Sequence, residues 1–454
     1  MFENIESQLS SFPIAVMRRK NRILNHRTMI EKKIAIGKKY GLIKSEYLPD
    51  ELVEENLSVI DGLSSGRSSF FAAQGKVLNN LKKCKREISI DEMNDDLWDV
   101  FKVGLLEFHI TDRCDQACPH CYYGSGPEGS QATIPIEEFQ KLKLINPKAI
   151  VITGGGEPTI YNYNGINFTQ AMAVIRELLP DVQLGMQTNG TVFPRGNWSN
   201  NFLYQRSSID ADKTETFALL KGANFFDKIV NNMPLFIKTN IPFVGVGFLF
   251  EKNNVDEIPA FIERMYSLVK QEAPEAIRKF TIQFRPFGPD LTALEEVRSD
   301  IKNHQEGITE SQINNVRNKV EKLCLRSKEL NNFIRQNTNV EEIYKGNSGH
   351  PLVEFDNCYI SLAYRMNRAG GNNFPCFILV QHMEFCMGNF FGKDPKNDYD
   401  AYLRIALLTY RFYNCRTKYC NSRFCRQAEV NRSAQLGLKE DPMDANNSFK
   451  VYFF

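Results

Sequence analysis

A regular alternation of short apolar runs and helical stretches fills the middle of the chain, from residue 103 to residue 288. The runs have the length of buried strands, and the stretches between them carry apolar residues at helical spacing. The predicted strands are 105–110, 149–153, 182–187, 207–210, 244–250 and 281–284, and the predicted helices are 136–145, 168–179, 214–220 and 258–273. This alternation predicts an α/β fold with a parallel sheet, whose functional residues follow the carboxyl ends of the strands.

The regions on either side of this alternation have other patterns. Residues 1–104 lack strand signals and are predicted to form a helical N-terminal extension to the α/β domain at 105–289. Residues 290–349 are polar and are predicted to form a helical linker. Six of the eleven cysteines fall in the last region, 350–454, which predicts a third, metal-organised domain there.

The charge balance limits the classes of partner. The chain has 56 Lys+Arg and 54 Asp+Glu, a net charge of only +2, so nucleic acid is not an expected partner. A local basic run at 18–39 either docks an acidic peptide or nucleic acid or forms a solvated helix face. No signal-peptide pattern and no bilayer-length apolar run is found, so we expect a cytoplasmic protein without a membrane partner.

Three cysteines directly after the first predicted strand point to a metal centre. Cys114, Cys118 and Cys121 have the spacing C-x3-C-x2-C. Three thiolates on one short loop can hold three irons of a [4Fe–4S] cluster and leave the fourth iron open. A structural zinc site and three buried thiols are the alternatives. A closed structural site would instead make the chain a non-catalytic, metal-organised interaction protein.

A glycine-rich loop with a carboxylate follows the second predicted strand. Gly154, Gly155 and Gly156 would let the backbone approach a ligand, and Glu157 can accept hydrogen bonds from an ammonium group. Alone, such a loop also fits a tight turn. Placed one strand–helix unit after the cysteine triplet, it resembles the GGE element of the radical S-adenosylmethionine (SAM) superfamily.

This resemblance covers about residues 103–288 and has several implications. It implies a partial (β/α)6 barrel and a [4Fe–4S] cluster on Cys114, Cys118 and Cys121, whose open iron binds SAM. Reductive cleavage of SAM would give a 5′-deoxyadenosyl radical, which abstracts a hydrogen atom from the substrate. The chain would then be an enzyme of oxidoreductase or lyase type that needs an electron donor such as flavodoxin or ferredoxin.

Polar residues and glycines at the strand ends resemble the positions near SAM in this family. Asp210 could instead cap the following helix, and Arg285 could belong to an ordinary ion pair. The cofactor-binding residues that the resemblance implies are His120, Gly154, Gly155, Gly156, Glu157, Gln187, Asn189, Ser208, Asp210, Gly245 and Arg285.

The C-terminal cysteines resemble a second iron–sulfur unit. Cys358, Gly371 and Cys376 fit the C-x9–15-G-x4-C opening of the SPASM and twitch extensions, which hold auxiliary [4Fe–4S] clusters, whereas the later cysteines depart from the full SPASM pattern. We expect one auxiliary cluster on Cys358, Cys376 and two of the later three, and a second one remains open. The predicted metal ligands of this region are Cys358, Cys376, Cys415, Cys420 and Cys425.

Cys386 is the remaining cysteine of this region. It is predicted to be a catalytic hydrogen-atom donor, with ligation of a second auxiliary cluster and a small buried hydrophobe as the alternatives. Many relatives with such an extension act on ribosomally made peptides or on proteins, so we expect a crosslink, an epimerisation or an oxidation of a peptide. Tailoring of a small natural product, such as an aminoglycoside or a nucleoside, is the alternative.

Overall fold

A mostly parallel sheet forms the centre of the computed structural model, which describes residues 27–32, 35, 103–286, 308–344, 364–374, 376 and 380. Among these residues, eight strands pair in the order β10-β9-β1-β2-β5-β6-β7-β8, and only β10 runs antiparallel to its neighbour. The strands are β1 (Leu105–His109), β2 (Ala149–Thr153), β5 (Gln183–Thr188), β6 (Phe202–Ser208), β7 (Phe243–Phe250), β8 (Phe280–Pro286), β9 (Tyr364–Asn367) and β10 (Asn373–Phe374). The predicted α/β fold with a parallel sheet is confirmed.

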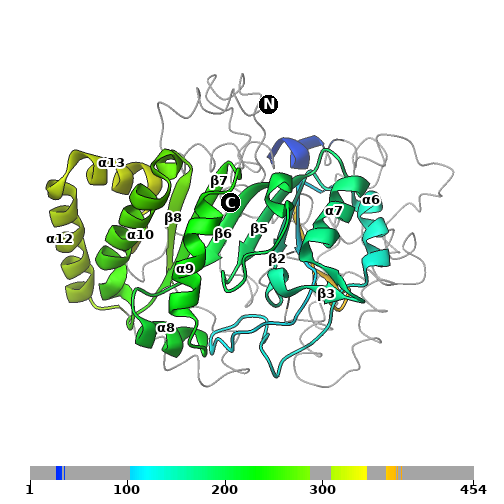
Figure 1. The fold of residues 1–454 in the computed structure, drawn as a ribbon, viewed down its shortest axis with the longest axis horizontal. Helices are drawn as coiled ribbons and strands as arrows, with labels where there is room; N and C mark the ends of the chain where they lie inside the picture. The colour runs from blue at the N-terminus through cyan, green and yellow to red at the C-terminus, as the bar shows by residue number, and fades with distance from the viewer. Residues whose placement is uncertain are drawn as a thin grey trace, which may run out of the picture.

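Helices follow the strands and cover one face of the sheet. Figure 1 shows α7, α9 and α10 in front of the strands, with α12 and α13 beyond β8. The helices are α6 (Leu142–Ile145), α7 (Phe168–Leu178), α8 (Thr214–Lys221), α9 (Phe226–Ile237), α10 (Ile258–Glu272), α12 (Glu310–Arg326), α13 (Lys328–Asn337) and α14 (Glu341–Tyr344). The 3-10 helices η2 (Ile136–Lys141) and η3 (Pro158–Ile160) and the hairpin of β3 (Asn162–Tyr163) with β4 (Ile166–Asn167) lie in the connections.

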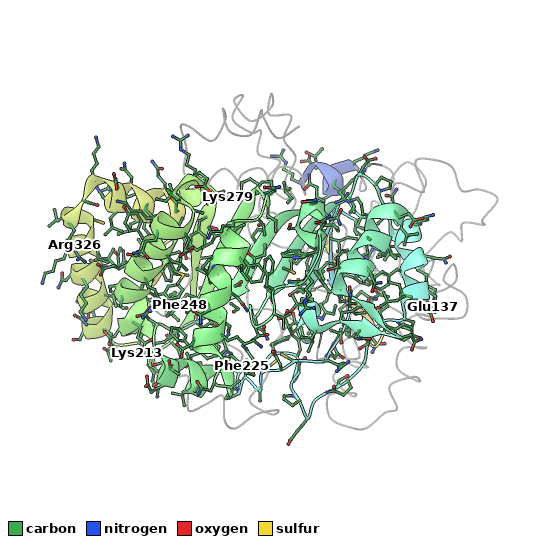
Figure 2. The ribbon with its side chains drawn as sticks, viewed as in Figure 1. Glu137, Lys213, Phe225, Phe248, Lys279 and Arg326 are labelled. Atoms are coloured by element: carbon green, nitrogen blue, oxygen red, sulfur yellow. The ribbon has the colours of Figure 1, made fainter. Side chains whose placement is uncertain are left out.

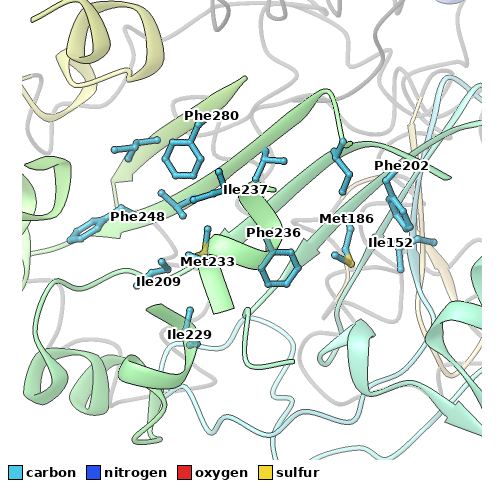
Figure 3. Close-up of a cluster of buried hydrophobic side chains, with 14 of the residues drawn as sticks. Ile152, Met186, Phe202, Ile209, Ile229, Met233, Phe236, Ile237, Phe248 and Phe280 are labelled. Carbon is cyan, nitrogen blue, oxygen red and sulfur yellow. The ribbon is translucent and has the colours of Figure 1, made fainter. Parts of the chain in front are cut away.

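The main core lies between the sheet and these helices. Side chains alternate between the two faces of a strand, so Leu106 and Phe108 of β1 belong to this core, whereas Leu105 belongs to a second cluster on the other face. Figure 3 shows Met233 and Phe236 of α9 against the strand residues. Full burial of an Ile, Phe or Met side chain contributes about 1.5–3 kcal/mol to folding, so this layer stabilises the domain.

The structure differs from the predicted elements in three places: one strand boundary, one helix and one further strand. The strand predicted at 207–210 is β6, which begins at Phe202 and ends at Ser208. Asp210 has a φ of +63°, which ends the extended backbone before the predicted boundary. Helix α9 was not predicted, and it contains Pro234. Strand β9 was not predicted either; it pairs with β1, although it lies within the region 350–454 for which a separate domain is predicted.

The helices in the region predicted as a linker pack on α10. Val316, Val320 and Leu323 of α12 are buried in the main core, and Glu329 of α13 accepts a hydrogen bond from Lys270 at 2.6 Å. Arg326 and Glu137 mark opposite ends of the domain in Figure 2. None of the helices in the described ranges is both long and apolar enough to cross a bilayer.

Gly245 provides a test of the sheet. A Cβ there would lie 2.3 Å from the backbone oxygen of Thr281 on the neighbouring strand β8, so Gly245→Ala must separate two paired strands. We expect a loss of about 1–3 kcal/mol in the free energy of unfolding, measured by urea denaturation. Gly370→Ala is the control, because a Cβ there has no atom within 4 Å. Equal stability of both variants would contradict the close contact between β7 and β8.

Candidate active site at the cysteine loop

The three cysteines of the triplet lie half-buried on the loop that follows β1. The backbone N–H of Cys121 donates to the carbonyl of Cys118 at 3.0 Å, which closes a tight turn between them. Burial raises the pKa of the Cys114 thiol to about 12 and that of Cys118 to about 11. The charge of Cys118 also raises the pKa of Cys114, and the charge of Cys121 raises the pKa of Cys118, so the thiols of the triplet interact electrostatically.

The glycine loop after β2 packs directly on the cysteine loop. The N–H groups of Gly156 and Glu157 donate to the carbonyls of Thr111 and Arg113 at 2.9 and 2.7 Å. A Cβ at Gly156 would lie 1.9 Å from the carbonyl oxygen of Arg113. A Cβ at Gly155 would lie equally close to the Asp112 carboxylate, and one at Gly154 would meet Gly156 itself. These glycines are therefore explained by contacts within the chain, whereas the sequence argument assigned them to ligand approach.

Glu157 is buried at the centre of this contact. Its Oε1 accepts hydrogen bonds from the N–H and hydroxyl of Thr159 and from the Thr188 hydroxyl, at 2.6–3.0 Å. Its Oε2 accepts one from the N–H of Asn189 at 2.6 Å. Burial raises the pKa of Glu157 even against these four bonds. Oε2 retains acceptor capacity, which an ammonium group could use.

The ends of β5 and β6 carry the other predicted polar groups. Asn189 donates to the Asp115 carboxylate at 2.6 Å, which ties β5 to the cysteine loop. Gln187 accepts a hydrogen bond from Arg206 of β6 at 2.6 Å, and the same guanidinium donates to Gln283 of β8. The sequence-based prediction missed Arg206, because the strand was predicted to begin only at residue 207, whereas β6 begins at Phe202.

A buried ion pair between Asp210 and Lys221 lies beside the triplet. Lys221 at the end of α8 donates to the Asp210 carboxylate, and Ser208 donates to the same oxygen at 3.2 Å. Burial opposes both charges, but their mutual attraction outweighs it, so the pKa of Asp210 is lowered and that of Lys221 is raised. The Lys221 charge lowers the pKa of Cys118, which places this cation next to the triplet.

Asp210 does not cap α8, which was its alternative role. Its Oδ1 accepts from the N–H of Leu249 at 2.6 Å. The residue at the N-cap of α8 is Lys213, which makes no side-chain cap, and Glu257 accepts from the N–H of Asp212 at 2.7 Å instead. Lys221 was missed from the sequence, because only the fold brings the end of α8 to the cysteine loop, where its carbonyl accepts from Ala117 at 3.1 Å.

The remaining predicted cofactor-binding residues lie near this pair. The His120 charge contributes to lowering the pKa of Asp210, and the Arg285 charge lowers the pKa of Lys221, so both basic groups act electrostatically on the ion pair. Gly245 is explained by its contact with β8. The structure therefore brings the triplet, His120 and Arg285 to one end of the sheet.

The auxiliary region is described only in part. Cys376 is half-buried, and its charge adds to the burial that raises the pKa of Tyr122. The other predicted residues of this region lie outside the described residues: Cys358, Cys386, Cys415, Cys420 and Cys425.

The donor set of the triplet is three half-buried thiols on one loop. Four ligands on one zinc would bring sulfurs within about 4 Å of each other, and no three His, Cys, Asp or Glu side chains in the described ranges converge in that way. Three neighbouring thiols that each bind a separate iron need no such convergence. The donor set therefore suits a cluster with one open iron.

A family model agrees with this donor set. Residues 108–265 match the model of the radical SAM superfamily. This segment is a radical SAM domain. The chain is thus an enzyme of the radical SAM class, and the domain implies a [4Fe–4S] cluster and SAM as its cofactors. No curated protein sequence matches the chain.

Solved structures similar to this chain include radical SAM proteins. SuiB from Streptococcus suis bound to S-adenosylmethionine has 14% identity and a TM-score of 0.45 over 72% of each chain. The protein anSMEcpe with bound AdoMet and Cp18Cys peptide has 15% identity and a TM-score of 0.44 over 73% of this chain and 88% of its own. BtrN with AdoMet and 2-DOIA has 12% identity and a TM-score of 0.35 over 70% and 91%.

The Asp210–Lys221 pair predicts strong coupling. Asp210→Asn and Lys221→Met should each cost about 3–5 kcal/mol in the free energy of unfolding, because each leaves a buried partner uncompensated. The double variant should cost less than the sum by at least about 1 kcal/mol, measured by urea denaturation. The exposed pair Lys270–Glu329 is the control, and removing it should cost at most about 1 kcal/mol. Additive losses at the buried pair would contradict the contact.

Proposed function

We propose that Cys114, Cys118 and Cys121 ligate the [4Fe–4S] cluster of the radical SAM domain. The observation that carries this assignment is the row of three neighbouring thiols, which the glycine loop holds at the carboxyl end of the sheet. When bound, the cluster supplies one electron that splits SAM into methionine and a 5′-deoxyadenosyl radical. The chain supplies three sulfur ligands and leaves one iron for SAM.

The surrounding residues bind and orient SAM in this proposal. Glu157 accepts a hydrogen bond from the ammonium group of SAM at Oε2, the oxygen with capacity left. Lys221 supplies positive charge that acts on Cys118, and Arg285 adds positive charge near Lys221; together they attract the SAM carboxylate. Asp210 holds Lys221 in place.

The remaining members of the proposed SAM site act through the backbone or through hydrogen bonds. Most of them lie at or just after strand ends, whereas His120 lies on the cysteine loop and Gly245 lies within β7. They are His120, Gly154, Gly155, Gly156, Gln187, Asn189, Ser208 and Gly245.

The substrate in this proposal is a ribosomally made peptide or a protein. Its support is the Cys358–Gly371–Cys376 spacing, which resembles extensions found in many peptide-modifying relatives. A natural-product substrate is the alternative outcome. The same spacing supports an auxiliary [4Fe–4S] cluster on Cys358, Cys376 and two of Cys415, Cys420 and Cys425. In this proposal Cys386 is a hydrogen-atom donor, and a flavodoxin or ferredoxin is the reductant.

Cys118→Ala tests the cluster assignment. Loss of one thiolate should abolish 5′-deoxyadenosine formation in protein reconstituted without oxygen and supplied with SAM and dithionite, measured by liquid chromatography. Cys324→Ala is the matched control, since Cys324 packs half-buried on α12 against the core. Unchanged 5′-deoxyadenosine in Cys118→Ala would refute the assignment.

A triple variant tests the auxiliary cluster. Replacing Cys114, Cys118 and Cys121 with Ala removes all ligands of the first cluster. With one auxiliary cluster, about four irons per chain should remain after anaerobic reconstitution, measured by iron and sulfide analysis. Iron-free protein that still has the circular dichroism spectrum of the wild type would exclude an auxiliary cluster.

A further inference from the structure

His109 ends β1 just before the cysteine loop, and its chemistry is not used by the proposed cofactor site. Its side chain has no exposed surface, and neither ring nitrogen has a hydrogen-bond partner. Neutral imidazole carries one donor and one acceptor, and leaving buried polar atoms unpaired destabilises the fold. A residue kept at this cost indicates a ligand that pairs it.

Two polar side chains, those of Glu107 and Tyr123, lie against this imidazole, and Tyr364 contacts Glu107. Oε1 of Glu107 lies 3.5 Å from Nε2 of His109, without the alignment of a hydrogen bond. Tyr364 donates to Oε2 of Glu107, and Tyr123 donates to its Oε1 at 3.4 Å. The ring of Tyr123 also packs edge-on against His109, with centroids 4.7 Å apart. The carboxylate is therefore held beside the ring by groups from two other segments.

These groups lie on the face of the sheet that the helices do not cover. Leu106 and Phe108 point into the helix-covered core, so Glu107 and His109 point to the opposite face. On β7, Val244 and Val246 point into the same core, so Gly247 lies on the opposite face. A Cβ at Gly247 would lie 3.3 Å from Arg206 of β6 and 3.7 Å from Arg285 of β8, so these two side chains lie over that face too. His109 thus shares a face with the proposed SAM site.

The geometry selects one kind of ligand group. The ring proton is favoured on Nε2, because this nitrogen faces the Glu107 carboxylate. A partner at Nε2 must therefore accept from this nitrogen, and next to the carboxylate it can also donate to Oε1, whereas Nδ1 would take a separate partner. A hydroxyl does both, and an oxygen about 2.8 Å from each atom forms a triangle with their 3.5 Å separation. An ammonium group has no lone pair to accept, and a carboxylate would face Glu107 with like charge.

We propose that His109 and Glu107 bind a hydroxyl group of the substrate. The inference deepens the proposed function and rests on it, because the substrate must reach the face where SAM binds. The hydroxyl comes from a serine or threonine side chain of a peptide, or from a cyclitol or sugar. His109 and Glu107 then orient the hydroxyl-bearing carbon beside the cysteine loop.

The experiment measures binding to the reconstituted, SAM-loaded enzyme by isothermal titration calorimetry. The probes are N-acetylserine methylamide, its alanine analogue, its 2,3-diaminopropionate analogue and myo-inositol. We expect a hydroxyl probe to bind at least about tenfold more weakly to His109→Phe and Glu107→Gln than to the wild type. Binding of the serine probe alone identifies a peptide source, and binding of myo-inositol alone identifies a polyol source.

Several results would overturn the proposal. The first is equal affinity of the serine and alanine probes, together with no effect of the variants on the affinity for myo-inositol. The second is a 2,3-diaminopropionate analogue that binds as tightly as the serine probe. Tyr163→Phe is the control, since the Tyr163 hydroxyl lies at β3 against Glu137, and it should change no affinity.

Thermal unfolding separates a ligand site from a structural role. His109→Phe removes two unpaired nitrogens, so its Tm should stay within about 2 °C of the wild type or rise. A larger fall in Tm would assign His109 to folding and overturn the proposal. Failure of the proposed function is seen separately, as wild-type enzyme that forms no 5′-deoxyadenosine.

Discussion

The site depends on a close approach between two backbones. The glycine loop after β2 touches the start of the cysteine loop so closely that a Cβ at Gly155 or Gly156 would overlap with Asp112 or Arg113. Two backbone hydrogen bonds hold this contact, and Glu157 fastens the glycine loop to the end of β5. Because the sheet fixes where β1, β2 and β5 end, it also fixes where the three thiols lie.

Buried charge then defines the chemistry beside those thiols. Asp210 and Lys221 are both nearly inaccessible to water, and each is held charged by the other. Such a pair adds little net stability because both groups lose their hydration, but it fixes the position of a cation. In this fold that cation acts on Cys118, whose pKa it lowers against the effect of burial.

The sequence predicted the α/β alternation, because buried parallel strands leave continuous apolar runs. The resemblance to the radical SAM family implied Glu157, Asn189 and Asp210 as site residues, and all three follow the carboxyl ends of strands. The sequence did not predict α9, which contains Pro234, or β9, which is short and pairs with a strand far away in sequence. Local periodicity carries no signal for a pairing of that kind.

The sequence by itself determined the class of chemistry, because the spacing of Cys114, Cys118 and Cys121 is a local property of one loop. Its apolar periodicity also determined the fold class, an α/β fold with a parallel sheet. Only the tertiary structure decided what surrounds the thiols. Lys221 is distant in sequence from Cys118, and Tyr364 still more distant from Glu107, so no local pattern relates them. Their proximity follows from strand order and helix packing, which are set by the whole core.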